Sequence, residues 1–270
     1  MLRFLSIVAL LFLVTIGAAQ SVLAWNTLET GLEYAVFLPE NPEGKTVEIR
    51  VLRIDPTLFE LVLKNASNMK DHTRRSAKAW GNDFSLLATI NASMYQEDRR
   101  TSVSLMQTRN HTNNSYFSND QTILAFDPRK KKIPSVTLID RQCDDFDSLR
   151  SHYGTLIQSI RMISCKGKNV WKQQARRASV AAIGMDVDGR VLFLHMSTPQ
   201  STYDFIQLLK ALPLDLKRAM YLEGSAPAQM VVNHPKLQVE MVGTWCSDRA
   251  KAGHRAFALP IPNVIGVVRK

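Results

Sequence analysis

Alternating and continuous apolar runs that predict β-strands dominate the chain. Residues 46–54 alternate apolar and polar positions, and a second run at 59–66 follows Asp55-Pro56, so the two are expected to pair as a hairpin. The more continuously apolar run at 85–93 predicts a central strand of a sheet. Further strands are expected at 121–128, at 135–140, on both sides of the hairpin signal Asp188-Gly189, and at 263–269.

Helical periodicity is confined to a few short segments. The clearest is 201–212, where Ser201 can cap the helix and Asp204 suits its positive N-terminal end. Residues 144–153 and 74–80 are weaker candidates. Because the strands come in hairpins before and after isolated helices, the pattern predicts an α+β fold with mixed, largely antiparallel sheets.

The first residues have the layout of a secretory signal peptide. Arg3 gives a positive start, an apolar run covers residues 4–16, and small residues lead up to Ala24. The alternative is a transmembrane anchor, which needs about 20 apolar residues, more than this run supplies. We therefore expect cleavage after Ala24 and export to the periplasm or the extracellular space. The mature chain, residues 25–270, is expected to form a single domain.

The net charge of the chain indicates which classes of molecule it is expected to bind. The chain carries a formal net charge of +10, which favours anionic partners. Its basic residues are scattered except at 129–132, where no aromatic residue is interleaved, so a nucleic-acid partner is disfavoured. Beyond the signal peptide no segment is long and apolar enough to span a bilayer, so no stable membrane insertion is expected after cleavage.

Three cysteines are present, which in an oxidising compartment permits one disulfide and leaves an odd thiol. Nearness in sequence favours a bond between Cys143 and Cys165. Cys246 lies in a polar loop and is expected to be dispensable for activity, although a pairing through Cys246 stays open. The absence of a C-x-x-C pair disfavours redox catalysis and a zinc ribbon.

The common hydrolase and phosphate-binding motifs are absent: there is no G-x-S-x-G, H-E-x-x-H or G-x-x-x-x-G-K-[ST] pattern. The dispersed histidines disfavour a metal site built on His, a carboxylate site stays open, and no cofactor is assigned. The chemistry then depends on polar residues at strand ends, where a rigid backbone can fix a side chain beside a cleft. These residues are Asn91, Arg161, Asp186, Glu223 and Asn263.

Each strand-end residue also has an ordinary structural explanation. An Asn at a strand end usually closes a turn, and Arg161 could pair with a surface carboxylate. Asp186 is assigned to the hairpin beside Asp188-Gly189. For Glu223, a satisfied turn residue and a functional acid are comparably good interpretations.

Five segments, in this order, are similar to the phosphodiester glycosidase family, and the resemblance covers residues 45–269. It implies a hydrolase that releases a sugar from a sugar phosphodiester by breaking the C–O bond at the anomeric carbon. The segments are "TINASMYQEDRRTSVSLM", "LIQSIRMIS", "RRASVAAIGMDVDGRVLFL", "AMYLEGSAPAQMVV" and "PIPNVIGV".

Some family positions match and others differ. Where the family has Asn, two glycines, an aromatic residue and an acid, Asn91, Tyr95 and Asp98 match, but Ala92-Ser93 replaces the glycines. Glu223-Gly224-Ser225 resembles an acidic-Gly-Gly stretch, with Glu for the commoner Asp and Ser for the second glycine. Since glycine lets the backbone approach a ligand closely, these replacements bear on the substrate and on activity.

The resemblance implies a role for each remaining residue. Gln158-Ser159 resembles the Gln-Ser stretch before the family's sugar-phosphate site, and Arg161 would hold a phosphate through two hydrogen bonds. The carboxylate pair would be Glu223 and Asp98. Substrate contacts would come from Asn91, Gly224, Ser225 and Asn263. The alternative is an envelope protein that binds anionic glycans or sugar phosphates without turnover, which the altered glycine positions favour.

Overall fold

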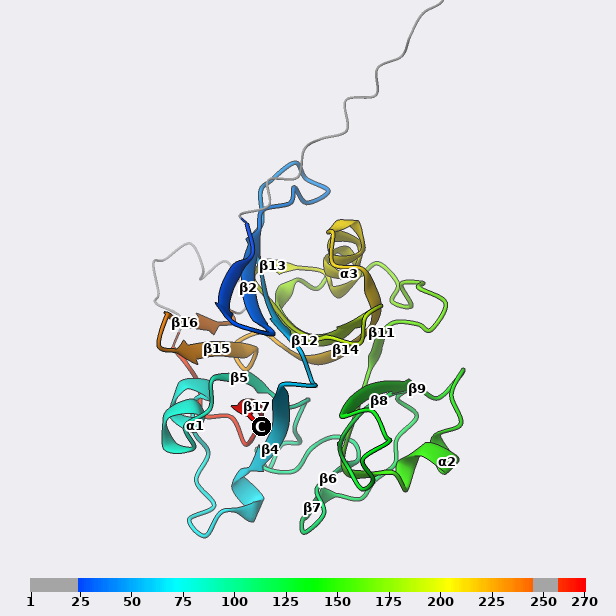
Figure 1. Ribbon diagram of the computed structural model, residues 1–270. Coiled ribbons are helices and arrows are strands. Elements are labelled where there is room, and N and C mark those ends of the chain that lie inside the picture. Colours follow the sequence, from blue (N-terminus) through cyan, green and yellow to red (C-terminus); the bar gives the residue numbers. More distant parts are fainter. Residues whose placement is uncertain (1–23, 245–256) are drawn as a thin grey trace, which may run out of the picture.

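Antiparallel β-sheets account for most of the secondary structure in the computed structural model, which describes residues 24–244 and 257–270 (Figure 1). Residues 1–23 of the predicted signal peptide and Cys246 lie outside this part of the chain. The predicted α+β class with largely antiparallel sheets is confirmed, and every strand pair among the described residues is antiparallel.

The largest sheet has seven strands and forms the upper part of Figure 1. The predicted hairpin at Asp188-Gly189 is confirmed: it joins two central strands, and Gly189 has the positive φ of 83° that favours glycine. The strand order is β1 (Asn26–Glu29), β2 (Leu32–Phe37), β3 (Ile49–Ile54), β13 (Val191–Gln200), β12 (Ala178–Asp186), β14 (Leu216–Gly224) and β11 (Arg161–Ile163).

Two five-stranded sheets lie below it, side by side in Figure 1. One has the order β16 (Leu237–Val242), β15 (Gln229–His234), β5 (Ala88–Asn91), β17 (Asn263–Arg269) and β4 (Phe59–Asn65). The other has the order β7 (Thr112–Asn114), β6 (Met106–Gln107), β10 (Tyr153–Ser159), β8 (Thr122–Pro128) and β9 (Val136–Asp140). The expectations that β5 is a central strand and that β8 and β9 flank the basic loop are confirmed.

The predicted hairpin between residues 46–54 and 59–66 is wrong. β3 pairs with β2 and β13 in the large sheet, whereas β4 pairs with β17 in another sheet. The turn at Asp55, whose carbonyl oxygen accepts the N–H of Phe59 at 3.0 Å, therefore transfers the chain between sheets. β3 buries residues on both of its faces, as strands inside a sheet do, and its two edges pair with the preceding strand β2 and the distant strand β13.

The helices match the predictions to different degrees. α3 (Thr202–Ala211) is confirmed, and the Ser201 side chain accepts the N–H of Asp204 at 3.0 Å as the predicted cap. α1 (Ala77–Asp83) begins later than expected, because Ser76 caps it. α2 (Phe146–Arg150) is shorter than the predicted segment. A single 3-10 turn covers Ala66–Asn68. No helix among the described residues is both long and apolar enough to cross a membrane.

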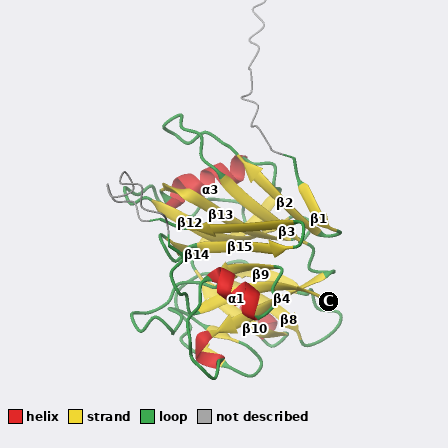
Figure 2. Cartoon of the chain, turned by 90° about the vertical axis from the view of Figure 1, so that its left-hand side faces the viewer, coloured by secondary structure: helices red, strands yellow, loops and turns green. Residues whose placement is uncertain are grey.

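The main hydrophobic core lies between the sheets, because it draws buried side chains from all three, such as Leu52, Leu124 and Ile265. A second core, which includes Phe205 and Leu209, fills the space between the large sheet and α3. In Figure 2, α3 covers the face of the large sheet that points away from the two smaller sheets. The strand ends between these layers are therefore held by packing on several sides.

Candidate functional site

The turn after β14 brings two strand ends together. Ala228 donates its N–H to the carbonyl oxygen of Ser225 at 3.0 Å, which closes the turn that leads into β15. Gln229, the first residue of β15, then donates its N–H to Asn91 Oδ1 at 3.2 Å. Because Asn91 is the last residue of β5, the ends of β14 and β5 meet at this turn.

The start of β17 joins the same group. The carbonyl oxygen of Asn263 accepts the N–H of Ala92 at 3.0 Å, and Val264 lies opposite Asn91 in the pairing of β17 with β5. Five of the residues predicted from the sequence therefore occupy adjoining strand ends. We call them the candidate site: Asn91, Glu223, Gly224, Ser225 and Asn263.

Glu223 is the titratable group of the candidate site. It is partly buried, lies opposite Ala181 of β12, and accepts the backbone N–H of Gly224 on Oε1 at 2.9 Å. Burial raises the pKa of this carboxyl from its ordinary value of 4.5 to about 7, although the Gly224 N–H and the charge of Arg176 act in the opposite direction. A carboxyl with such a pKa changes its protonation near neutral pH, as an acid or base catalyst must.

Two tyrosines lie within electrostatic reach of Glu223. The pKa of Tyr95 is raised first by burial and then by the charge of Glu223, and the same two causes raise the pKa of Tyr221. Tyr221 also packs against Trp171, with ring centroids 5.5 Å apart. Tyr95 matches the family pattern in the sequence, whereas Tyr221, two residues before Glu223 on the same strand, carries no such signal.

Gly224 has no space for a side chain. A Cβ atom there would collide with the Tyr221 hydroxyl and would lie 3.3 Å from the carbonyl oxygen of Ser179. The glycine therefore allows the phenol of Tyr221 to pack directly over the backbone beside the Glu223 carboxylate. A larger residue would displace the phenol, the backbone or both.

Ser93 and Ser225, which the resemblance placed at glycine positions, both have a backbone conformation that favours glycine. Ser93 has φ 90° and Ser225 has φ 61°, and both side chains are buried. Ser225 also donates its N–H to the carbonyl oxygen of Ser179 at 2.9 Å, which ties the turn to β12. Both turn positions therefore have a conformation that favours glycine, although each carries the side chain of a serine.

Asn263 and Asn91 differ in how many hydrogen bonds their side chains form. Asn263 Oδ1 accepts from Asn65 Nδ2 at 2.8 Å, and Asn263 Nδ2 donates weakly to the carbonyl oxygen of Arg100 at 3.4 Å. Asn91 Nδ2 is buried and has no hydrogen-bond partner among the described residues. An unpaired buried donor calls for an explanation. Asn65, at the end of β4, was missed although the strand-end criterion applies to it as well.

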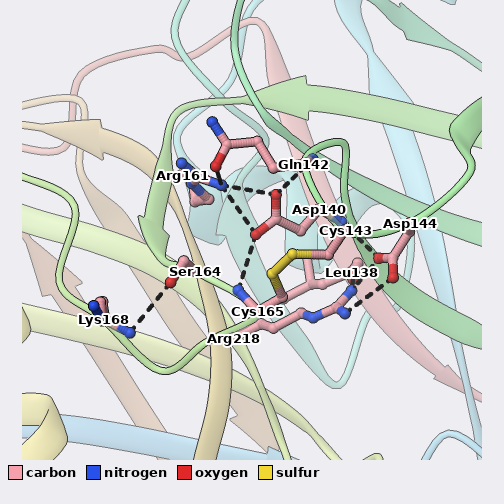
Figure 3. The surroundings of a disulfide bond; sticks show 10 residues. All are labelled: Leu138, Asp140, Gln142, Cys143, Asp144, Arg161, Ser164, Cys165, Lys168 and Arg218. Carbon is pink, nitrogen blue, oxygen red and sulfur yellow. Dashed lines mark hydrogen bonds and ion pairs between the residues drawn. A yellow bond between two sulfur atoms is a disulfide. The ribbon is translucent and has the colours of Figure 1, made fainter.

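Arg161 forms no hydrogen bond with the candidate site among the described residues and pairs instead with a buried aspartate. Its Nη1 donates to Asp140 Oδ1 at 2.8 Å and to Gln142 Oε1 at 2.8 Å, while Asp140 also accepts the N–H of Cys165 at 2.9 Å (Figure 3). Asp140 is 1% exposed and Arg161 12% exposed, so this is a buried ion pair. The role of Arg161 as a phosphate ligand stays a prediction, and the structure gives it a structural partner.

Asp98 is exposed, and its own turn satisfies its carboxylate. Oδ1 accepts the N–H groups of Arg100 and Thr101, each at 2.9 Å. Hydrogen bonds led by the Thr101 hydroxyl lower the pKa of Asp98. No hydrogen bond joins Asp98 to Glu223 in the described part of the chain, so their pairing stays a prediction. Asp186 belongs to its hairpin as expected, because its Oδ1 accepts from Arg190 N at 2.8 Å.

The disulfide between Cys143 and Cys165 agrees with the pairing favoured from the sequence, with the two Cα atoms 6.5 Å apart. It links the turn after β9 to the loop after β11, next to the Asp140–Arg161 pair (Figure 3). The two sulfur atoms and an Asp140 oxygen lie within 4.8 Å of one another. A metal would need thiolates there, and the disulfide removes them.

Replacing both Cys143 and Cys165 with serine is expected to lower the free energy of unfolding by about 2–4 kcal/mol, because the bond restricts the unfolded chain. Urea denaturation of both proteins measures this loss. Cys246→Ser is the matched control and should leave stability and turnover unchanged. A mass-spectrometric map of the unreduced protein that shows any linkage through Cys246 would contradict the assignment.

The pKa of Glu223 also predicts a pH dependence of stability. The folded protein holds this proton more tightly than the unfolded chain, so the contribution of the group is present below about pH 4.5 and lost as the pH rises through about 7. We expect the stability of the wild type relative to Glu223→Gln to fall across this window and then to level off. Urea denaturation of both proteins from acidic to mildly alkaline pH measures the difference, and parallel profiles would contradict the raised pKa.

Comparisons with known proteins identify the family and the fold. The sequence profile of the phosphodiester glycosidase family matches residues 85–268. The fold is similar to the catalytic domain of zebrafish N-acetylglucosamine-1-phosphodiester alpha-N-acetylglucosaminidase, auto-inhibited by its pro-peptide, with a TM-score of 0.66 and 12% identity over 94% of this chain and 90% of that one. It is also similar to a hypothetical protein from Synechocystis, with a TM-score of 0.63 and 12% identity over 94% of this chain and 64% of that one.

No curated protein sequence matches the chain. The family match covers more than half of the sequence, and the chain therefore belongs to the phosphodiester glycosidase family.

Proposed function

We propose that the protein hydrolyses a sugar phosphodiester at the C–O bond of the anomeric carbon. The observation that carries this proposal is the position of Glu223 in a member of this family: it lies near the end of β14, where the following turn meets Asn91 of β5 and Asn263 of β17, and burial raises its pKa. The phosphate monoester that leaves the anomeric carbon is already a good leaving group. The reaction therefore depends little on a strong acid. It depends on a carboxylate that activates water or stabilises positive charge at the anomeric carbon.

In the proposed hydrolysis, Glu223 acts as the general base. A water oxygen attacks the anomeric carbon and its proton passes to the Glu223 carboxylate, while the C–O bond breaks and its electron pair remains on the phosphate oxygen. The products are a free sugar and a phosphate monoester. The unpaired Asn91 Nδ2 is suited to a sugar hydroxyl, and Asn263 lies beside it on β17.

A chromogenic substrate tests the proposal. N-acetylglucosamine, the sugar in the name of the zebrafish enzyme, is the first to try, as its p-nitrophenyl phosphodiester. C–O cleavage should release the free sugar and p-nitrophenyl phosphate, whereas P–O cleavage to the aryl group would release nitrophenol. Saturable binding with neither product would favour the second candidate, a protein that binds anionic glycans. The side chains added at Ser93 and Ser225 are the observation that supports this candidate.

Export is part of the same proposal and depends on the signal-peptide pattern at residues 1–24. N-terminal sequencing of the protein recovered from the producing cell should begin at Trp25. Recovery of intact Met1 in an integral membrane fraction would contradict cleavage.

A further inference from the structure

Three arginine-bearing segments adjoin the candidate site. Arg176 lies two residues before the start of β12, whose Ser179 carbonyl oxygen accepts the N–H of Ser225 at 2.9 Å. Because β12 runs antiparallel to β14, the segment with Arg176 lies at the same end of the sheet as the turn after Glu223.

The other two arginines approach from the side of β17. Arg74 Nη1 donates to the carbonyl oxygen of Pro260 at 3.3 Å, on the segment that leads into β17. Arg99 lies in the tight turn enclosed by the bridge between Tyr95 and Ser102, with φ 56°. The same turn contacts Asn263, which donates to the carbonyl oxygen of the next residue, Arg100. We call Arg74, Arg99 and Arg176 the arginine rim.

The arginine rim has no carboxylate partner among the described residues, in contrast to other arginines of the protein. Arg161, Arg190 and Arg218 each form an ion pair with an aspartate. Arg99 and Arg176 are exposed, so their charge faces solvent at the margin of the site. Exposed positive charges without an acidic partner attract anionic ligands.

The charges of the arginine rim act on the groups around Glu223. Arg176 lowers the pKa values of Glu223 and Tyr221, against the larger effect of burial, and Arg74 and Arg99 lower that of Tyr95 in the same way. Arg176 therefore acts on the Glu223 carboxylate, and Arg74 and Arg99 act on the phenol of Tyr95, which also feels the charge of Glu223. Cations around these two groups suit a substrate that itself carries a negative charge.

We propose that Arg99 and Arg176 bind the phosphate of the substrate from two sides of the turn after β14, with Arg74 adding charge from the β17 side. This inference rests on the proposed function for the identity of the site. The arginine rim would then have the phosphate-binding role that the family resemblance implies for Arg161. Guanidinium groups suit this role because each can donate two parallel hydrogen bonds to phosphate oxygens.

Calorimetric binding to proteins that carry Glu223→Gln tests the proposal without turnover. Arg99→Gln and Arg176→Gln, singly and together, should each weaken binding of the N-acetylglucosamine p-nitrophenyl phosphodiester about tenfold or more, because each removes a hydrogen bond between charged groups. Binding of the neutral p-nitrophenyl glycoside should change little. Arg150→Gln, an exposed arginine on α2, is the matched control and should bind the diester normally.

The outcomes separate the two proposals. Turnover by the otherwise unmodified protein tests the proposed function, and diester binding tests the arginine rim. An unchanged dissociation constant in the double variant, an equal loss with Arg150→Gln, or equal losses for diester and neutral glycoside would overturn the assignment. Absence of saturable diester binding to the Glu223→Gln protein would overturn it as well. Weaker diester binding in a protein that shows no turnover would support the arginine rim and reject the hydrolase.

Discussion

Glu223→Gln is expected to reduce the turnover of a sugar phosphodiester by about 10²–10⁴-fold, the usual contribution of a positioned acid or base. Gln keeps the size of the side chain and an oxygen that can accept the Gly224 N–H, but it cannot take a proton from water. The melting temperature at neutral pH should not fall, because burial makes the ionised carboxylate unfavourable in the folded state. Initial rates and thermal denaturation on one preparation measure both quantities.

Asp98→Asn is the informative control for this result. Asp98 is exposed and satisfied within its own turn, so its replacement should lower turnover much less than Glu223→Gln. Full turnover by Glu223→Gln together with an altered melting temperature would identify Glu223 as a turn residue. A large loss in Asp98→Asn would then move the catalytic role to Asp98.

Arg161→Met is expected to reduce the free energy of unfolding by about 3–5 kcal/mol, because it leaves the Asp140 carboxylate buried without its charged partner. Replacing both residues, as Asp140→Leu with Arg161→Met, should restore part of this loss, since it removes both buried charges. Urea denaturation measures the three proteins. Only part of the loss returns, because Asp140→Leu also removes the acceptor of the Gln142 and Cys165 backbone N–H groups.

Arg150→Met is the matched control for a surface pair. Arg150 lies 3.8 Å from Asp147 and both side chains are largely exposed, so its replacement should change stability by less than about 1 kcal/mol. If Arg161→Met leaves stability unchanged but weakens binding of the diester alone, Arg161 is the phosphate ligand that the sequence predicted.

Local signals predicted the elements whose partners are close in sequence. Asp188-Gly189 specified the β12–β13 hairpin because such a turn requires a positive φ at glycine, and Ser201 marked the start of α3. The same reasoning failed for β3 and β4. Proximity suggested that they pair, but β3 pairs with the distant strand β13, and no local pattern identifies that partner.

The candidate site was predictable where a side chain is fixed by the end of its own strand, as for Asn91, Glu223 and Asn263. It was not predictable where the role depends on a partner elsewhere in the chain. Arg161 has a strand-end position, but its ion pair with Asp140 comes from another sheet. The position of Tyr221 over Gly224 depends likewise on tertiary packing.

Hydrolysis in ¹⁸O-labelled water tests the central assignment most directly. The products of the N-acetylglucosamine p-nitrophenyl phosphodiester are analysed by mass spectrometry for the wild type and for Glu223→Gln. If Glu223 activates water at the anomeric carbon, the label appears in the free sugar and not in the phosphate monoester, and the variant releases labelled sugar at least about 10²-fold more slowly. Label in the phosphate, or equal release of sugar by both proteins, would contradict the assignment of Glu223.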